Sequence, residues 1–287
     1  MKGQNPMKDY LIIMPAYNEA SNIGIVLNDM IPYREYTLVI DDGCTDDTKH
    51  IVEEYGFNCL SNLENLGVAN SIIKGMNYAL EQNFKKLIIM EADGQHNPAY
   101  IPQFLKELEE HDFVFGCRYH KDELIPTNKW AANLFAAALY AELTGQFLTD
   151  ISCGFKGMHI SGGLLEAIKE SQGFGIVYDI VSYALCMKKD ISIVPIDAVY
   201  YYDELLCTRN NEIMALLNSV ENCRKVFGKN PMDRFGYAIR NMKQAVQLNI
   251  LRWRSHPISW NRATGSVIKS WSSDDGSHDL CRGSPAG

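Results

Sequence analysis

The chain of 287 residues has the composition of a globular protein: 46% of it is apolar and 22% is charged, which excludes the disordered, collagen-like and coiled-coil classes. Its 27 Lys and Arg stand against 35 Asp and Glu, so the formal net charge is −8. Because an acidic chain gains nothing from the counterion release that drives nucleic-acid binding, we expect no nucleic-acid partner.

The sequence gives no support for a membrane span, a zinc site or a disulfide framework. The most apolar stretch, 134–141, is far shorter than the roughly 18 residues that a span requires, and the first ten residues contain no apolar core of a signal peptide. Eight cysteines include no Cys-x-x-Cys pair, which is typical of a reduced compartment. We therefore expect a cytoplasmic protein whose membrane contact is at most peripheral, at the inner membrane face.

The first 120 residues alternate short apolar runs with segments of helical periodicity. Strands are predicted over residues 10–14, 37–40, 57–60, 86–90 and 113–117. Helices are predicted between them, over residues 23–30 with Ser21 as a candidate cap, and over 51–55, 69–80 and 101–109. This alternation predicts an α/β fold, with a Rossmann-like, mostly parallel sheet covered by helices on both faces.

The second half has a different pattern. A helix is predicted over 127–144, a strand over 155–160, a helix over 178–187 and short strands over 191–194 and 198–202. Helical periodicity returns over 210–251, broken near Gly228 and Pro231, and residues after 254 show none. We expect one α/β domain over 1–205, a helical C-terminal extension over 206–254 and a disordered or loosely attached tail over 255–287.

Polar or acidic clusters follow three of the predicted strands, at residues 15–19, 41–46 and 91–96. Ligands of parallel sheets bind outside the carboxyl ends of the strands, so these clusters are expected to converge on one site. At the second cluster, a carboxylate of Asp41 or Asp42 can accept hydrogen bonds from a ribose hydroxyl or a base N–H, and Gly43 permits a turn with positive φ. Residues 45–48 have the types that cap a helix.

The third cluster has the pattern of a divalent-cation site. Glu91 and Asp93 alternate on an extended segment, which can point both carboxylates the same way, and Gln95 continues the alternation with a side-chain carbonyl. A lone Glu-x-Asp is more often a solvated acidic turn. Its place after a buried strand and beside a second acidic strand end favours a site for Mg²⁺ or Mn²⁺.

Six segments, read together, carry a family resemblance: 15–19, 41–48, 65–67 with Gly75, 89–96 with Pro98, 116–118 and 150–155. In order and spacing they resemble the inverting nucleotide-sugar glycosyltransferases of family 2, which have the GT-A fold. The nearest branch is that of the dolichyl- or polyprenyl-phosphate sugar synthases, and the similarity covers about residues 9–205. It implies that the domain over 1–205 is a GT-A nucleotide-sugar-binding and catalytic domain.

This resemblance implies roles for individual residues. The nucleoside-diphosphate sugar would be bound by Pro15, Tyr17, Glu19, Asp41, Asp42, Asn65, Lys74 and Asp93. Glu91, Asp93 and Gln95 would hold Mg²⁺ or Mn²⁺ against the diphosphate, and Arg118 would reach an anionic group. His96 follows the metal segment and could touch a phosphate, whereas His159 is expected to pack on a strand.

Departures from the family pattern leave the acceptor open. Glu91 replaces the usual Asp, Cys44 the usual Ser, and Lys129 an Arg whose bidentate fork it lacks. Asp203 and Glu204 lie where the lipid-phosphate branch has an Arg and Gly-x-Ser, so either a saccharide or a polyprenyl phosphate remains possible as acceptor. A hydroxyl acceptor needs a general base, for which Asp179 is the candidate, beside Arg118 and Lys129 as further catalytic residues.

Two other functions compete with a metal-dependent inverting hexosyltransferase. The first is a nucleotide-sugar-binding protein without transfer activity, favoured by Glu91 and the missing downstream Arg. The second is a metal-dependent phosphoryl-transfer domain, which the order of the motifs disfavours.

Overall fold

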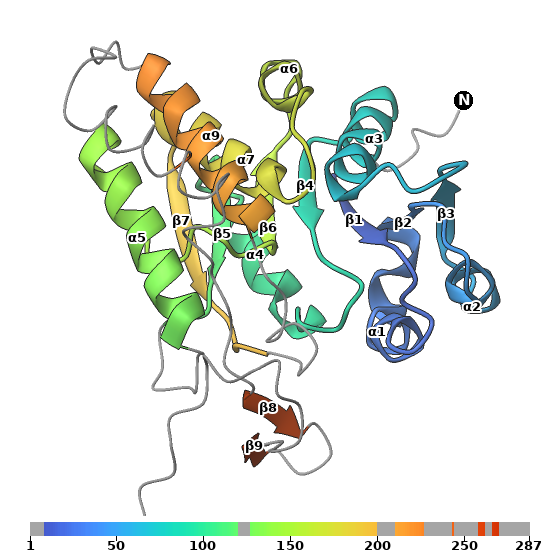
Figure 1. Ribbon diagram of the computed structural model, residues 1–287. Helices are drawn as coiled ribbons and strands as arrows, with labels where there is room; N and C mark the ends of the chain where they lie inside the picture. Colours follow the sequence, from blue (N-terminus) through green and yellow to red (C-terminus); the bar gives the residue numbers. More distant parts are fainter. Residues whose placement is uncertain are drawn as a thin grey trace, which may run out of the picture.

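Seven strands form the central sheet of the computed structural model, which describes residues 9–119, 127–199, 210–226, 243, 258–261 and 266–269. The strands are β1 (Tyr10–Ala16), β2 (Thr37–Asp41), β3 (Asn58–Ser61), β4 (Lys86–Ile89), β5 (Phe113–Cys117), β6 (Lys156–His159) and β7 (Ile191–Pro195). Their order in the sheet is β3-β2-β1-β4-β6-β5-β7 (Figure 1). All neighbours pair in parallel except at β6, which is antiparallel to both β4 and β5, so the expected mostly parallel sheet is confirmed.

Helices cover both faces of this sheet. They are α1 (Ile23–Asp29), α2 (Thr48–Glu54), α3 (Val68–Glu81), α4 (Ile101–Glu107), α5 (Thr127–Thr144), α6 (Gly162–Ile168), α7 (Gly175–Cys186) and α9 (Asn210–Val226), with short 3-10 helices η1 (Ile31–Tyr36) and η2 (Pro98–Tyr100). Residues of α3, α5, α6, α7 and α9 share one core with one face of the strands. Residues of α1, α2 and α4 share the second core with the other face.

Alternation along the strands explains why both cores form. Ile12 and Met14 of β1 belong to the core beneath α1 and α4, while Leu11 and Ile13 belong to the core beneath α3. Successive side chains of a strand point to opposite faces, so a continuous apolar run buries both of them.

Several predicted boundaries differ from the structure. Ser21 does not cap α1, whose N-cap is Asn22 without a side-chain cap bond, and α7 begins at Gly175 instead of 178. Helix α6 was not predicted. Ala198 and Val199 are in no strand, and residues 200–202 lie outside the described part of the chain.

The C-terminal part can be compared with the predictions only in pieces. Helix α9 occupies the first part of the predicted helical segment, and of its remainder, 227–251, only residue 243 is described. Within the predicted tail, β8 (Ile258–Asn261) and β9 (Ser266–Lys269) pair as an antiparallel hairpin, and the expected disorder of 255–287 stays a prediction.

Candidate active site

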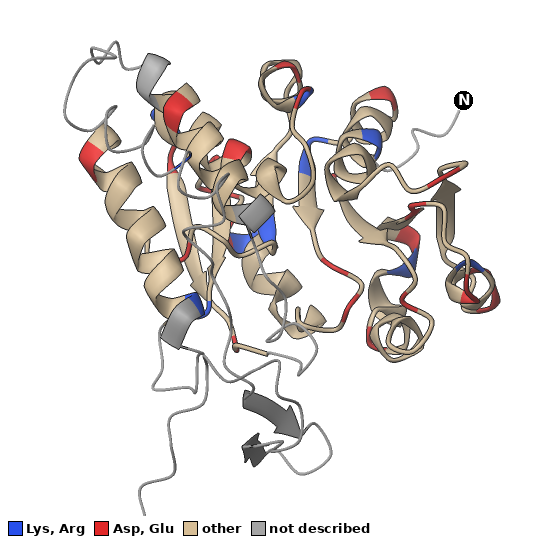
Figure 2. Ribbon diagram, in the orientation of Figure 1, with Lys and Arg blue, Asp and Glu red and all other residues tan. Residues whose placement is uncertain are grey.

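The loops with candidate residues meet at one edge of the sheet. β1, β2, β4 and β5 all end there, and antiparallel β6 begins there, since Lys156 is in register with Ile89 of β4 and Phe115 of β5. The segment 150–155, which precedes β6, is thereby brought to the loops that follow the parallel strands. Figure 2 shows acidic residues at the end of β2 and in the loop after β4.

Asp41 ends β2 as a buried anion. It is 4% exposed, and its Oδ1 accepts a hydrogen bond from the backbone N of Cys44 at 2.8 Å. Burial alone would raise its pKa, but the hydrogen bonds from Cys44 and Ser61 outweigh burial and hold the pKa below its usual value. Gly43 turns the chain with φ +70, and a Cβ there would overlap the backbone of Glu64, so both the conformation and the close approach require glycine.

Asp42 anchors the loop between β3 and α3. Its Oδ1 accepts hydrogen bonds from Nδ2 of Asn62 (2.7 Å) and the backbone N of Leu66 (3.0 Å), and its Oδ2 accepts one from the N of Gly67 (2.8 Å). Both oxygens are therefore engaged by protein donors, and the contact predicted between Asp42 and a nucleotide stays a prediction.

Asn65 and Lys74, predicted to border the nucleoside pocket, belong to the same loop network. Oδ1 of Asn65 accepts a hydrogen bond from the N of Gly67 at 2.9 Å. Nζ of Lys74 donates to the carbonyl of Ser61 at 2.7 Å and to Oδ1 of Asn62 at 2.8 Å. These bonds fix the loop beside Asp41.

The loop after β1 is fastened to the loop after β2. The N of Glu19 donates to Oγ1 of Thr48 at 2.8 Å, and its Oε2 accepts from Nδ2 of Asn22 at 3.1 Å. Pro15 is buried within β1, whereas Tyr17 is 43% exposed at the edge of the sheet. An aromatic ring held open to solvent there is a surface on which a planar base can stack.

Glu91, Asp93 and Gln95 lie in one short loop after β4. Oδ1 of Asp93 accepts a hydrogen bond from the N of Gln95 at 2.8 Å, and Gly94 between them has φ +81. Nε2 of Gln95 is buried and has no hydrogen-bond partner within the described residues. The loop therefore holds a polar group whose bonding a ligand would complete.

His96 supports this loop as a neutral imidazole. Its Nδ1 accepts a hydrogen bond from the backbone N of Glu91 at 3.1 Å, and its ring stacks on Phe155 with centroids 5.1 Å apart. Burial, with the Arg118 cation as a second cause, lowers its pKa to about 3. The expected contact of His96 with a phosphate stays a prediction, while the structure gives it a positioning role.

The carboxylate of Glu91 packs against Gly154, in the segment that leads into β6. A Cβ at residue 154 would overlap Oε1 of Glu91. Mg²⁺ usually binds only one or two protein carboxylates and completes its coordination shell with substrate oxygens. The carboxylates of Glu91 and Asp93 and the amide of Gln95 fit such a cation. Within the described residues, no three His, Cys, Asp or Glu side chains form a protein-only metal cluster.

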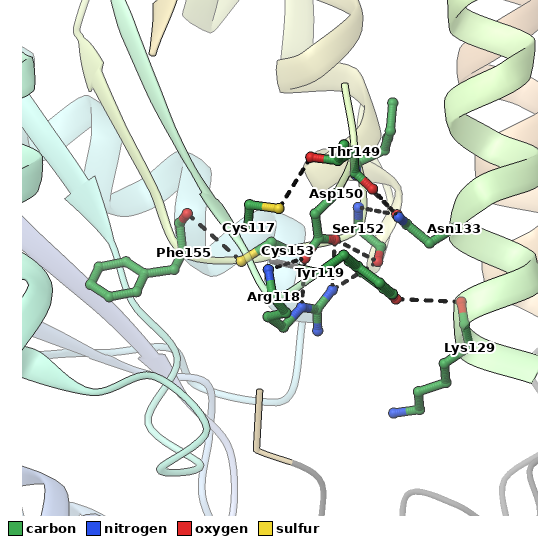
Figure 3. A network of polar contacts seen from close by, with 11 residues as sticks. Cys117, Arg118, Tyr119, Lys129, Asn133, Thr149, Asp150, Ser152, Cys153 and Phe155 are labelled. Atoms are coloured by element: carbon green, nitrogen blue, oxygen red, sulfur yellow. Dashed lines mark hydrogen bonds and ion pairs between the residues drawn. The ribbon is translucent and has the colours of Figure 1, made fainter. Parts of the chain in front are cut away.

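Arg118, expected to reach an anion, is engaged by a buried carboxylate of the protein itself (Figure 3). Its Nε and Nη2 donate to the two oxygens of Asp150 at 2.8 and 2.9 Å, and Nη2 also donates to Oγ of Ser152 at 2.9 Å. Burial by itself raises the pKa of Asp150, but the Arg118 guanidinium outweighs burial and holds that pKa below its usual value. This bidentate pair fixes the segment that carries Gly154.

Helix α5 is fastened to the same segment through Asn133 (Figure 3). Oδ1 of Asn133 accepts a hydrogen bond from the N of Ile151 at 3.0 Å, and its Nδ2 donates to the carbonyl of Thr149. The carbonyl of Lys129, one turn earlier, accepts from the hydroxyl of Tyr119 at 3.4 Å (Figure 3). The catalytic role of Lys129 stays a prediction.

Asp179, the predicted base, lies in the first half of α7. Its Oδ2 accepts a hydrogen bond from Oγ of Ser171 at 2.6 Å, which ties the loop before α7 to that helix. Its role as a base stays a prediction. His159 is the last residue of β6 and is exposed, and its Nε2 lies 2.8 Å from the carbonyl of Leu108.

Lys156 is a feature of the site that the sequence reasoning missed. It is fully buried, its Nζ lies 4.4 Å from the centroid of the Phe115 ring, and within the described residues that nitrogen has no hydrogen-bond partner. Burial lowers the pKa of its amine to about 8. The available signal was its position, since it is the single Lys or Arg in the predicted strand 155–160.

Comparisons with known proteins show which family the chain belongs to. Residues 11–171 match the family described as "Glycosyl transferase family 2". The chain belongs to glycosyl transferase family 2. The chain is also 34% identical over 209 residues to an uncharacterized protein of Methanocaldococcus jannaschii. This similarity covers 68% of the chain and 89% of that protein.

Two relatives with named activities are similar over much of their length. The undecaprenyl-phosphate mannosyltransferase of Micrococcus luteus is 29% identical over 66% of the chain and 83% of its own. The UDP-N-acetylglucosamine–dolichyl-phosphate N-acetylglucosaminyltransferase of Methanococcus voltae is 28% identical over 68% of the chain and 88% of its own. The family and these relatives make the chain a glycosyltransferase.

Solved structures establish the fold. Glucosyl-3-phosphoglycerate synthase of Mycobacterium tuberculosis, in complex with UDP, superposes with a TM-score of 0.59 at 18% identity, covering 74% of this chain and 80% of that one. The expected GT-A fold is thereby confirmed. Among the described helices, none combines the length and apolar character needed to cross a bilayer.

Proposed function

We propose that this family 2 glycosyltransferase moves a hexose from a nucleoside-diphosphate sugar to an acceptor, with inversion at the anomeric carbon and with a divalent cation. The observation that carries the proposal is the meeting of the acidic loops after β2 and β4 at one edge of the sheet, with the Asp150 segment packed against them. Ligands of open α/β sheets bind at this edge.

The donor half of the site would work as follows. Asp41, held as an anion, would accept hydrogen bonds from the ribose or the base, and the exposed ring of Tyr17 would stack on the base. Glu91, Asp93 and Gln95 would hold Mg²⁺ or Mn²⁺, which would offset the charge on the departing diphosphate. Solved complexes of the mycobacterial synthase that contain Mn²⁺ and UDP-glucose support a donor and a cation of this kind.

For the acceptor, we favour a polyprenyl phosphate over a saccharide. The named relatives act on undecaprenyl and dolichyl phosphate. Helix α5, fastened to the site through Asn133, exposes Trp130, Leu134 and Phe135 at 49%, 42% and 38%. An exposed apolar face beside the site suits an isoprenoid chain, because it would remove this surface from water. Asp203 and Glu204, which weigh against a phosphate acceptor, lie outside the described residues.

A saccharide acceptor would make a different demand on the site. A sugar hydroxyl must lose a proton as it attacks, and Asp179 is the carboxylate predicted to take that proton. A phosphate acceptor is already an anion and needs no base. Replacement of Asp179 by Asn therefore separates the two acceptors: transfer to a saccharide would be lost and transfer to a lipid phosphate retained.

A nucleotide-sugar-binding protein without transfer activity is the second candidate. The observation that favours it is the bidentate pair of Arg118 with Asp150, which commits this cation to the protein instead of to an acceptor anion. Donor binding without turnover on any acceptor would support that function.

The test combines a panel of donors with a panel of acceptors. The folded protein is incubated with Mn²⁺, with UDP-, GDP- or dTDP-hexoses, and with a short-chain polyprenyl phosphate, a saccharide or no acceptor. Calorimetry measures donor binding and mass spectrometry measures the product. We expect binding of one donor class and cation-dependent transfer to the polyprenyl phosphate, and no binding of any donor would contradict the proposal.

Matched variants identify the cation site. Asp93→Asn removes a predicted ligand, and we expect it to lower cation-dependent donor binding by a factor of about 10 or more. Asp47→Asn is the control, because Asp47 is exposed at the start of α2 and makes no side-chain cap bond. An unchanged Mn²⁺ dependence in Asp93→Asn would remove Asp93 from the site.

A further inference from the structure

Helices α7 and α9 pack side by side in matched register. Oγ of Ser182 lies 2.8 Å from Oγ of Ser219. One helical turn further along both helices, Sγ of Cys186 lies 3.1 Å from Sγ of Cys223. Because both pairs advance by four residues together, the two helices run in parallel (Figure 1).

Small side chains permit this close packing. At the start of α7, a Cβ at Gly175 would lie 3.3 Å from the Cβ of Ala215 in α9, and the serine pair lies between this contact and the cysteine pair. The hydroxyl of Tyr140 from α5 closes a buried network with Ser182 at 2.7 Å and Ser219 at 3.1 Å. The network holds the two helices together, which keeps the thiols in contact.

The contact between the thiols is close to that of a disulfide. A disulfide has a sulfur–sulfur bond of about 2.05 Å, so the two Sγ atoms would need to approach by about 1 Å. A displacement of this size is within the reach of side-chain rotation and a slight shift of either helix.

The two thiols differ in access. Cys186 is partly exposed, whereas Cys223 is 1% exposed. The hydrogen bond between them lowers the pKa of Cys186 and raises that of Cys223. Since the thiolate is the nucleophile, an oxidant would reach and react with Cys186 first, and Cys223 would resolve the product.

We propose that Cys186 and Cys223 are a site of reversible oxidation, at which a disulfide joins α7 to α9. The oxidant is a low-molecular-weight disulfide. The Cys186 thiolate attacks one of its sulfurs, which forms a mixed disulfide and releases one thiolate. The Cys223 thiol loses its proton to solvent and attacks Sγ of Cys186, which forms the protein disulfide and releases the second thiolate. Two cysteine thiols are oxidised and one small disulfide is reduced to two thiols.

Oxidation would stabilise the attachment of α9, because a disulfide restricts the unfolded chain. The bond would close a loop that includes β7 and the segment from α7 to α9. We expect it to raise Tm by about 5–10 °C and to slow proteolytic cleavage within α9. This inference is independent of the proposed transferase activity, since neither cysteine belongs to the candidate site.

The test uses the full chain treated with glutathione disulfide, and a second sample reduced with dithiothreitol. Intact mass and non-reducing peptide mapping locate the bonds, and thermal unfolding measures Tm. In the oxidised wild type we expect loss of the mass of two hydrogen atoms, a linked peptide pair containing Cys186 and Cys223, and a higher Tm that dithiothreitol reverses. Free thiols at both residues, or a bond from either to another cysteine, would overturn the proposal.

Three variants assign the order of the steps. Cys223→Ser should accumulate a mixed disulfide with glutathione at Cys186, whereas Cys186→Ser should leave Cys223 unmodified. Cys59→Ser is the control, because Cys59 is partly buried on β3, and it should oxidise as the wild type does. Modification of Cys223 in the Cys186→Ser variant would contradict the assignment of Cys186 as the first nucleophile. The peptide map of the wild type tests the proposal even where a variant fails to fold.

Discussion

Gly154 leaves room for the carboxylate of Glu91, and alanine would remove that room. The added Cβ would overlap Oε1 of Glu91, so the carboxylate would have to leave its position. If Glu91 helps to hold the cation, we expect Gly154→Ala to weaken Mn²⁺-dependent donor binding about 10–100-fold, as disturbed supports of metal ligands commonly do. Calorimetry with the donor, with and without Mn²⁺, measures the effect.

Gly162→Ala is the matched control for this prediction. Gly162 begins α6, and a Cβ there has no heavy atom within 4 Å. This variant should bind the donor as the wild type does. Equal donor affinity in a folded Gly154→Ala protein would show that the position of Glu91 is unimportant for binding.

Lys156 makes the stability of the fold depend on pH in the alkaline range. Its amine titrates at about 8 in the folded chain because of burial, and at about 10.4 when unfolded. Between these values the unfolded chain binds a proton that the folded chain does not, so this group makes the free energy of unfolding rise with pH. At pH 7 the Lys156 amine is protonated in both the folded and the unfolded chain, so its buried charge destabilises the folded state.

Replacement of Lys156 by Met removes both the charge and its titration. We expect the variant to be more stable than the wild type at pH 7, and this advantage to shrink by about 3 kcal/mol toward pH 10.5. Urea unfolding of both proteins at several pH values gives the difference. A difference that does not change with pH would mean that Lys156 keeps its proton throughout.

At the residue scale, the sequence predicts where the polar side chains gather but not which atoms they contact. Asp41 and Asp42 were equivalent in the pattern, yet the first binds its own turn and the second holds the loop before α3. Lys156 was missed because a strand position does not reveal that a side chain is enclosed on both sides. These distinctions depend on contacts between segments far apart in the chain.

At the scale of elements, the loop between β3 and α3 depends on a single carboxylate. In Asp42→Asn the amide oxygen can take the place of Oδ1, but the NH₂ group then faces the N–H of Gly67. We expect this variant to lose about 1–3 kcal/mol of unfolding free energy, because the hydrogen bond from Gly67 to a charged oxygen is replaced by a contact between two donors, although Asn65 still accepts from the same N–H. Denaturant unfolding measures the loss, and a variant as stable as Asp47→Asn would contradict the anchoring role.

Predictions of whole elements succeeded where periodicity was strong. The strands of the first half and α5, with the predicted bounds 127–144, follow from apolar patterns alone. The place of β6 between β4 and β5 did not follow, because a pattern of apolar residues contains no information on strand order. Helix α6 is only seven residues long and begins with two glycines, so it has too few turns to show a helical period.

At the scale of the whole molecule, membrane contact depends on the balance between net charge and the exposed face of α5. A charge of −8 opposes adsorption to anionic lipid, whereas Trp130, Leu134 and Phe135 present apolar area. We expect partial and reversible binding to zwitterionic vesicles and less binding to anionic ones. Flotation with both kinds of vesicle measures the bound fraction.

Two variants test whether α5 is the contact. Phe135→Ser should lower binding to zwitterionic vesicles, while Ile25→Ser should not, because Ile25 is 54% exposed on α1, which covers the other face of the sheet. Tight, salt-resistant association that Phe135→Ser leaves unchanged would contradict this prediction.

In the sheet, β6 lies between β4 and β5, two strands that precede it in the chain. This position affects the order in which the chain can fold during synthesis. Both partners of β5, β6 and β7, are made after it. All five residues of β5 are buried in the finished sheet. Its pairing with β6 extends to Met158, so the ribosome must add the 41 residues 118–158 before this apolar strand can complete its pairing with β6. At about 5–20 residues per second, that interval is about 2–8 s, during which an unpaired strand invites pairing with other chains. The yield of folded protein in a cell should therefore respond to translation speed through this stretch and to chaperones that shield β5.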